Sequence, residues 1–494
     1  MIHRHCQLAV VAGMLVGLAV TATSSAQDGE VTARLEKQLR QAEQSYMLRI
    51  NPQLSATERA LIDYGAVLTF GFLAVDDLDQ QTHLMRQYDA QLYGYVNVDG
   101  VHEAFGRLRF TYRDFNEGDA FDERGDYWDY PLSDRWWYRF DLGRAIEAYE
   151  GRRWPHDLTV KIGRQYIDWG SGLTLSEQLY AALVAFEWDQ AIEVRGLVGL
   201  TPASSVVDFD SSRPSFDSDT DRLFAGGQVA WTGWQNHQPY AFVLVQRDQN
   251  DEDQTDFDDL PIPYFDVHFH YDSTYWGIGS RGELLPRLRY RAEFVYETGS
   301  GLSSPYDPVA LVPVDQTEED IRAWAARLEL SYHLLDENLT ELAFEALVAS
   351  GDDDRDQDTS NTFGGNRSGT DDTAFNGFGF INTGLAFAPA VSNLTMFRVG
   401  GSTFPLRDRS KQLFRRFQVG ADAFFYLKTD ADAPFDEPTN DQTWLGFEVD
   451  VYANWRIASD LAVFGRYGVF FPGDGIDGDS DERHFLYTGV TYSF

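Results

Sequence analysis

The chain has 494 residues, of which 43% are hydrophobic and 15% aromatic, with a mean hydropathy of −0.37 and a formal net charge of −38. A mean hydropathy this low excludes a membrane protein built of spanning helices, but it suits a large β-barrel, where only every second strand residue faces lipid. The net charge is unfavourable to a polyanion partner, although the location of the charges matters more than their sum, and no nucleic-acid-binding patch appears. The single cysteine, Cys6, excludes disulfides and cysteine metal sites in the exported chain.

The N-terminus predicts a secretory signal peptide, residues 1–26. An apolar run from Leu8 to Val20 is followed by small residues at Ser24–Ala26, which is typical of a cleavage site. The run is shorter than the roughly 20 residues that a spanning helix needs. We therefore expect this segment to be removed on export.

Residues 27–61 predict a short N-terminal periplasmic helix before the barrel. Segment 30–48 is rich in helix formers, and Leu35 and Leu39 recur at helical spacing. Pro52 ends the pattern. We expect this helical arm to lie in the periplasm.

From residue 62 to residue 494, apolar and polar residues alternate with a period of two, which predicts an all-β region. In "GRLRFTYRDF", Leu108, Phe110 and Tyr112 face one way and arginines face the other. Such alternation places one face against an apolar phase and the other against water. We predict 18 strands, at 63–75, 83–98, 101–114, 134–149, 157–167, 176–187, 191–201, 221–232, 239–247, 266–280, 287–298, 320–334, 339–350, 391–403, 413–428, 442–456, 461–471 and 484–494.

The connections favour a transmembrane antiparallel β-barrel over a secreted soluble β-protein. Short links, such as Asp99-Gly100, alternate with long acidic or glycine-rich segments. Outer-membrane barrels have short periplasmic turns, longer external loops and an even number of strands. Segment 375–387 could form a further strand, but the number of strands would then be odd and the later long loops would lie on the periplasmic side. We therefore assign it to a long external loop that can fold inward. The last strand ends on an aromatic residue, Phe494, as expected of a strand that closes a membrane barrel.

Much of the negative charge lies in four predicted external loops, which carry 22 acidic residues against two basic ones. Such loops can be bridged by divalent cations to each other and to lipopolysaccharide, although simple solubility explains them equally well. No resident cofactor is expected apart from calcium. Four aspartates in one loop are spaced like the start of a calcium-binding loop, without its later glutamate: Asp352, Asp354, Asp356 and Asp358.

Alternation also predicts which charged residues line the pore. Rings of positive charge in a lumen select anions, and two arginine groups are expected on nearly opposite walls. The alternative is that these arginines only neutralise lumenal carboxylates. The predicted pore-lining residues are Arg107, Arg109, Arg113, Arg139, Lys161, Arg195, Arg289, Arg291, Arg327, Glu448, Asp450 and Arg466.

Two segments resemble the alginate-export outer-membrane proteins. The segment "LGFEVDVYANWRIASDLAVFGRYGVFFPGDG" is similar to the last hairpin region of that family, and "VKIGRQYIDWGSG" to its Gly-Arg-Gln strand. The resemblance implies an 18-stranded barrel that passes an anionic exopolysaccharide outward without energy input, fed by periplasmic partners. It also implies a pore role for Arg164, although simple alternation places this residue on the lipid face unless a bulge at Gly163 turns it inward.

Other chemistry in the sequence is weaker. His268 and His270 could share a metal, but polar rim residues are the favoured interpretation. Trp136 and Trp137 are expected in an interfacial aromatic girdle rather than in a sugar platform. No catalytic motif appears, and we expect no enzyme activity. The resulting hypothesis is a channel for an anionic polysaccharide in the outer membrane of a Gram-negative-type bacterium. The alternatives are a general or anion-preferring porin, and a surface protein that acts through its acidic loops.

Overall fold

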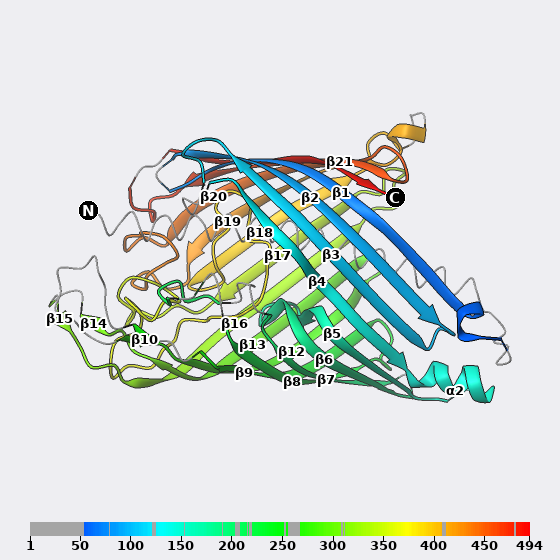
Figure 1. Cartoon of the computed structure of the whole chain (residues 1–494). Coiled ribbons are helices and arrows are strands. Elements are labelled where there is room, and N and C mark those ends of the chain that lie inside the picture. The colour runs from blue at the N-terminus through cyan, green and yellow to red at the C-terminus, as the bar shows by residue number, and fades with distance from the viewer. Residues whose placement is uncertain are drawn as a thin grey trace.

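The computed structural model describes residues 54–494 except 79, 121–124, 153, 190, 203–207, 215, 217–219, 251–252, 255–266, 308–309, 311, 408–411 and 479–480. The described chain forms a closed barrel of 18 antiparallel strands, as predicted (Figure 1). The barrel closes because β1 pairs with β2 along one edge and with β22, the last strand, along the other. Because the sheet is closed, no strand of the wall has an unpaired edge, which is what a membrane requires of a β-structure.

The wall strands follow one another around the ring in chain order. Their bounds are β1 (Ala60–Asp76), β2 (Thr82–Val98), β3 (His102–Phe115), β4 (Tyr127–Asp141), β5 (Asp157–Trp169), β6 (Leu175–Trp188), β7 (Ile192–Leu200), β8 (Arg222–Trp231), β9 (His237–Asp248), β12 (Tyr271–Leu285), β13 (Leu288–Leu302), β16 (Glu318–His333), β17 (Glu341–Ala349), β18 (Leu394–Thr403), β19 (Phe417–Lys428), β20 (Trp444–Arg456), β21 (Leu461–Pro472) and β22 (Arg483–Ser493). Two short ribbons lie in the loops: β10 (Asp253–Gln254) with β11 (Val267–His268), and β14 (Tyr306–Asp307) with β15 (Val312–Pro313).

The helices that the structure describes are the α-helix α2 (Leu142–Glu150) and two 3-10 turns, η1 (Ala56–Glu58) and η2 (Gln412–Phe414). Within the described chain, none of them is long and apolar enough to cross a bilayer. Most of the predicted arm, residues 27–61, lies outside the described residues.

The fourth predicted strand, 134–149, is wrong in its second half. The strand ends at Asp141, whose side chain caps α2 by accepting a 2.8 Å hydrogen bond from the Arg144 amide. The helix ends at Gly151, which adopts a φ of 67° and donates to the Glu147 carbonyl. The apolar residues of "LGRAIEAYE" therefore recur at helical rather than strand spacing.

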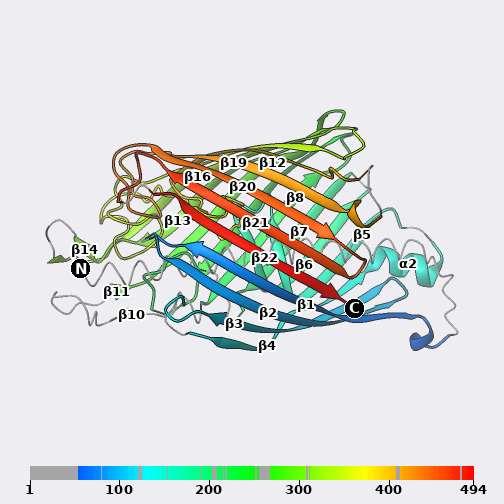
Figure 2. The ribbon, with the colours of Figure 1, turned by 90° about the horizontal axis from the view of Figure 1, so that it is seen from above.

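The two ends of the barrel differ (Figures 1 and 2). Long loops gather at one end, which we call the long-loop end. The short turns, α2 and the C-terminus lie at the other, the short-turn end. Along each strand, side chains that point outward alternate with side chains that point into the lumen. On β13, Phe294 is 42% exposed on the outer surface, whereas Val295, on the lumenal face, is fully buried. The outer wall therefore presents the apolar band that a bilayer needs.

Candidate functional site

The strand register places twelve of the thirteen predicted pore residues on the lumenal face. On β3 these are Arg107, Arg109 and Arg113, which share the face of the buried Thr111. Residues paired across neighbouring strands lie on the same face of the sheet, so the pairings identify the lumenal residues of the other strands. The remaining members of this set are Arg139, Lys161, Arg195, Arg289, Arg291, Arg327, Glu448, Asp450 and Arg466.

Most of the arginines near β3 are paired with lumenal carboxylates. Arg107 donates to both oxygens of Asp134, at 2.9 and 2.5 Å, and the pair is almost fully buried. Arg109 pairs with Asp89 and Arg113 with Asp129, each at 2.7 Å. On this wall the arginines neutralise carboxylates, which was the alternative to an anion-selecting ring.

A second group of arginines lies on β12, β13 and β18, and here positive charges meet. Arg281 and Arg291 are directly paired across the β12–β13 ladder. Among the described residues, Arg281 donates at 2.7 Å to the neutral Gln238, and Arg291 lies 3.3 Å from Glu329. With Arg289 and Arg398 they line a cavity of about 720 Å³ at the short-turn end, which is also lined by Glu283, Glu329 and Glu341. Arg281 was not predicted. Its only sequence signal is that it shares a strand face with the lumenal Gly277 and Gly279.

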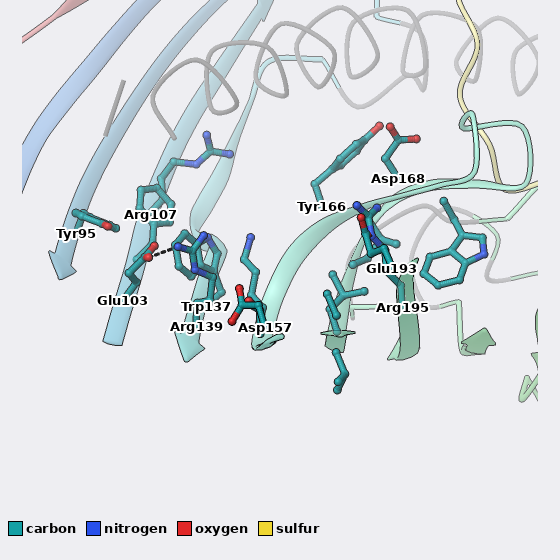
Figure 3. Close-up of a pocket in the computed structure, with 18 of the residues that line it drawn as sticks. Tyr95, Glu103, Arg107, Trp137, Arg139, Asp157, Tyr166, Asp168, Glu193 and Arg195 are labelled. Carbon is teal, nitrogen blue, oxygen red and sulfur yellow. Dashed lines mark hydrogen bonds and ion pairs between the residues drawn. The ribbon is translucent and has the colours of Figure 1, made fainter. Parts of the chain in front are cut away.

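A second cavity, of about 490 Å³, lies against β2–β7 (Figure 3). Glu103, Trp137 and Arg139 approach it from β3 and β4, and Glu193 and Arg195 from β7. Charges of both signs line this cavity, together with several aromatic rings.

The predicted placement of Trp137 in an interfacial girdle is wrong. Trp137 lies on the lumenal face and is 5% exposed, whereas Trp136 lies on the outer surface and is 45% exposed. Adjacent strand residues point to opposite faces, so only one tryptophan of the pair can face lipid.

Arg164 lies where β5 leaves the wall, and not in either cavity. The β4–β5 ladder ends at the pair Trp136–Arg164. Gly163 adopts a φ of 133° without a shift of register, and Arg164 is 7% exposed, with its guanidinium 5.7 Å from the Tyr180 ring centroid. The bulge considered from the sequence is thus absent, and Arg164 packs on an aromatic ring.

Beyond Gly163, the tip of the β5–β6 hairpin (165–179) folds into the barrel. Both faces of β5 are then inside. Residues 166–169 all line the cavity of about 490 Å³, and Ile167 and Trp169 also belong to a buried apolar cluster. The tip reaches another part of the wall, where Ser171 Oγ donates to Glu293 at 2.7 Å and the Ser171 carbonyl accepts from Arg327 at 2.8 Å.

The loop between β17 and β18 also fills the lumen, as expected for segment 375–387. It forms no wall strand and is hydrogen-bonded to the hairpin tip through Ser176 and Phe378. Its other contacts cross the lumen: the Asn376 amide donates to Glu297 at 3.0 Å, and three successive amides at 385–387 donate to Glu448. We call the hairpin tip (165–179) and loop residues 374–390 together the lumenal plug.

Apolar packing holds the lumenal plug in place. Leu173, Phe378 and Phe387 pack with wall residues such as Phe242 and Phe470 in one buried cluster. The rings of Phe387 and Phe470 are nearly parallel, with centroids 4.1 Å apart. Burial of such rings stabilises by about 1.5–3 kcal/mol each, so the plug is firmly seated.

The four aspartates considered for calcium are not brought together. Asp356 pairs with Arg367 at 2.7 Å, and Asp358 accepts from the amides of Ser360 and Asn361. Asp352 and Asp354 do lie close to each other, and their carboxylate oxygens are within 4.8 Å of those of Asp353.

The chain is similar to one protein family and to several solved structures. A family model described as alginate export matches residues 202–486. Among solved structures, Pseudomonas aeruginosa OccK11 (OpdR) is 10% identical and covers 88% of this chain and 96% of its own, with a TM-score of 0.49. Pseudomonas aeruginosa OccK5 (OpdH) is 9% identical, with coverages of 87% and 98% and a TM-score of 0.47. Pseudomonas putida OprB is 11% identical, with coverages of 88% and 94% and a TM-score of 0.41. No curated protein matches the chain.

Proposed function

The chain belongs to the alginate export family, and we propose that it is an outer-membrane channel that carries an anionic polysaccharide outward through its lumen. The polymer would pass passively, without catalysis. Alginate is one candidate among such polymers.

The observation that carries this proposal is the direct opposition of Arg281 and Arg291 across β12 and β13. Like charges at directly opposed strand positions destabilise a sheet. In a confined lumen their fields are also less screened than on an open surface. Glu329 offsets the charge of Arg291, whereas Arg281 donates to the neutral Gln238. An anion that binds beside Arg281 would therefore lower the electrostatic free energy of the pair.

The two ends of the barrel differ in charge, which bears on where a polyanion would enter. Arg281, Arg289 and Arg291 line the cavity at the short-turn end, which we assign to the periplasm. The acidic loops lie at the long-loop end, which we assign to the exterior. This distribution would raise the local concentration of a polyanion at the periplasmic mouth and lower it at the outer one. The direction of passive transport would follow from the delivery of polymer in the periplasm. Periplasmic partners that deliver the polymer, and lipopolysaccharide around the outer loops, belong to the same proposal.

Ion selectivity in planar bilayers tests the proposal. The triple variant Arg281→Gln, Arg289→Gln, Arg291→Gln should shift the reversal potential in a salt gradient towards cations. The matched control removes three arginines from the long-loop end: Arg247→Gln, Arg322→Gln and Arg367→Gln. These side chains are roughly half exposed, and we expect little shift. Equal shifts in both variants would contradict a specific role for the lumenal group.

A second candidate, a general porin for small solutes, is favoured by one observation. The arginines near β3 are neutralised by Asp89, Asp129 and Asp134, so that wall offers little net attraction for a polyanion. A porin of this kind would conduct chloride and acetate readily but would not bind an acidic hexasaccharide.

A further inference from the structure

Three aromatic side chains form a row on the lumenal wall of the cavity at β2–β7. Tyr93 comes from β2, Phe105 from β3 and Trp137 from β4. The ring centroids of Tyr93 and Phe105 are 6.4 Å apart, and those of Phe105 and Trp137 are 5.8 Å apart. In both pairs the angle between the ring planes is only 20°. Near-parallel rings at this spacing are offset rather than face to face, so the three rings form one continuous apolar row, in which Tyr93 and Phe105 are partly exposed and Trp137 is covered.

The row does not belong to the packed interior of the barrel. None of its members is part of either buried apolar cluster that the described residues form. It does not serve as a membrane belt either, because belts face lipid and these rings line the cavity. The neighbouring Trp136 is the tryptophan of this pair that lies on the outer surface.

Polar groups surround the row. The Lys161 ammonium lies 4.3 Å from the centroid of the Trp137 ring, over its face. Arg139 and Glu103 form an ion pair beside it (Figure 3). Trp137 Nε1 is buried and has no hydrogen-bond partner among the described residues. A buried donor without a partner costs about 1–3 kcal/mol, and a ligand oxygen would remove that cost.

We propose that Tyr93, Phe105 and Trp137 form a subsite for one pyranose ring of the transported polymer. The apolar C–H face of the sugar would lie on the rings, and one of its oxygens would accept a hydrogen bond from Trp137 Nε1. The Lys161 ammonium would move from the ring face to a carboxylate of the polymer. A cavity of about 490 Å³ in which aromatic rings lie beside charged side chains of both signs offers a stacking surface together with groups that can orient a ligand. This inference deepens the proposed function and rests on it for the acidic nature of the sugar.

Calorimetric titration of the full-length exported protein in detergent tests the subsite. The probes are a β-1,4-linked mannuronate hexamer, which is acidic, and maltohexaose, which is neutral and of the same length. We expect Trp137→Ala to weaken binding of the acidic probe at least tenfold. Trp137→Phe, which keeps an apolar ring but loses Nε1, should weaken it about threefold. The matched control Trp136→Ala should bind as the unaltered protein does. Heat-dependent mobility on gels establishes that each variant is folded, and Trp137→Phe carries the test if Trp137→Ala is not.

The outcomes separate the subsite from the proposed function. If the acidic probe binds and the Trp137 variants bind it as Trp136→Ala does, the subsite is wrong and the export proposal stands. If only maltohexaose binds, and the Trp137 variants weaken it, the pyranose subsite stands and the anionic substrate is wrong. If the unaltered protein binds neither probe, the subsite is overturned.

Discussion

Glu448, on the lumenal face of β20, accepts a 2.8 Å hydrogen bond from the backbone amide of Phe387 in the loop between β17 and β18. The same carboxylate accepts from the amides of Leu385, at 2.5 Å, and Ala386, at 2.8 Å. Glu448 is fully buried. One side chain of the wall therefore holds three successive residues of the lumenal plug.

Replacement of Glu448 by alanine should loosen the plug. Hydrogen bonds to charged groups contribute about 1.5–3 kcal/mol each, and this variant leaves three amides without their acceptor. We expect higher single-channel conductance and more frequent open events in planar bilayers. The matched control is Asp422→Ala, which also removes a lumenal carboxylate, on β19, but one with no hydrogen bond to the plug among the described residues. Unchanged conductance in Glu448→Ala, with the protein inserted, would show that the plug does not limit the current.

The bend of β5 should depend on Gly163. A Cβ atom there would lie 2.3 Å from the Trp136 carbonyl oxygen and 2.7 Å from the Trp137 Cα, and the φ of 133° is strained for other residues. We expect Gly163→Ala to lower the free energy of unfolding in urea by about 1–3 kcal/mol. Gly196→Ala on β7 is the control, because its Cβ would meet no atom within 4 Å. Equal stability of the two variants would mean that the hairpin can enter the lumen without this glycine.

The loop between β19 and β20 should respond to pH through Asp436. The pKa of Asp436 is raised from 3.8 to about 6, mainly by burial; the hydrogen bond from the Ala390 amide lowers it, and the nearby Asp358 and Glu437 carboxylates raise it. The folded loop therefore holds its proton more tightly than the unfolded chain. This stabilisation is fully present below pH 3.8 and is lost as the pH rises through about 6.

Hydrogen exchange at the Ala390 amide measures this effect, since that amide donates to Asp436 at 2.8 Å. After correction for the intrinsic rate, protection should fall between pH 4 and pH 7 in the unaltered protein. The fall should be smaller in Asp436→Asn, which has no carboxyl group to titrate. An equal fall in both proteins would assign the pH dependence to another group.

The orientation of the barrel can be tested by cysteine labelling, because Cys6 is the only native cysteine and lies in the predicted signal peptide. Asp441 and Ser459 are both exposed, at the long-loop and short-turn ends respectively. In intact cells a membrane-impermeant maleimide should label Asp441→Cys and not Ser459→Cys, whereas lysed cells should label both. Labelling of Ser459→Cys in intact cells would reverse the topology.

The sequence predicted the wall of the barrel well, because each strand has one face in lipid and one in water. That constraint repeats every two residues, so the sequence pattern shows where most strands lie and which connections are short turns or long loops. The same parity excluded segment 375–387 from the wall, and the structure places it in the lumen. Where a segment does not span the barrel the rule fails, as at α2, whose cap at Asp141 and helical spacing were overlooked.

The site was less predictable, since it depends on contacts between distant segments. Alternation gives the face of Arg107 but not its partner Asp134, which decides whether the charge is available to a ligand. Alternation assigned Arg164 to the outer face, where the register pairs it with Trp136 and Tyr180. Nothing in the sequence shows that β5 leaves the wall at Gly163 or that Arg164 is buried there. Trp137 was grouped with Trp136, although strict alternation could have separated them.

Efflux from proteoliposomes tests the central claim most directly. Vesicles that contain the protein would be loaded with the labelled mannuronate hexamer or with labelled maltohexaose, and release would be followed for the unaltered protein and for Glu448→Ala. The account predicts that the acidic sugar leaves faster than the neutral one. It also predicts that Glu448→Ala increases both release rates. The triple variant Arg281→Gln, Arg289→Gln, Arg291→Gln should remove the preference for the acidic sugar. The account would be contradicted if neither the unaltered protein nor Glu448→Ala released the acidic sugar faster than protein-free vesicles do, although Glu448→Ala conducts ions.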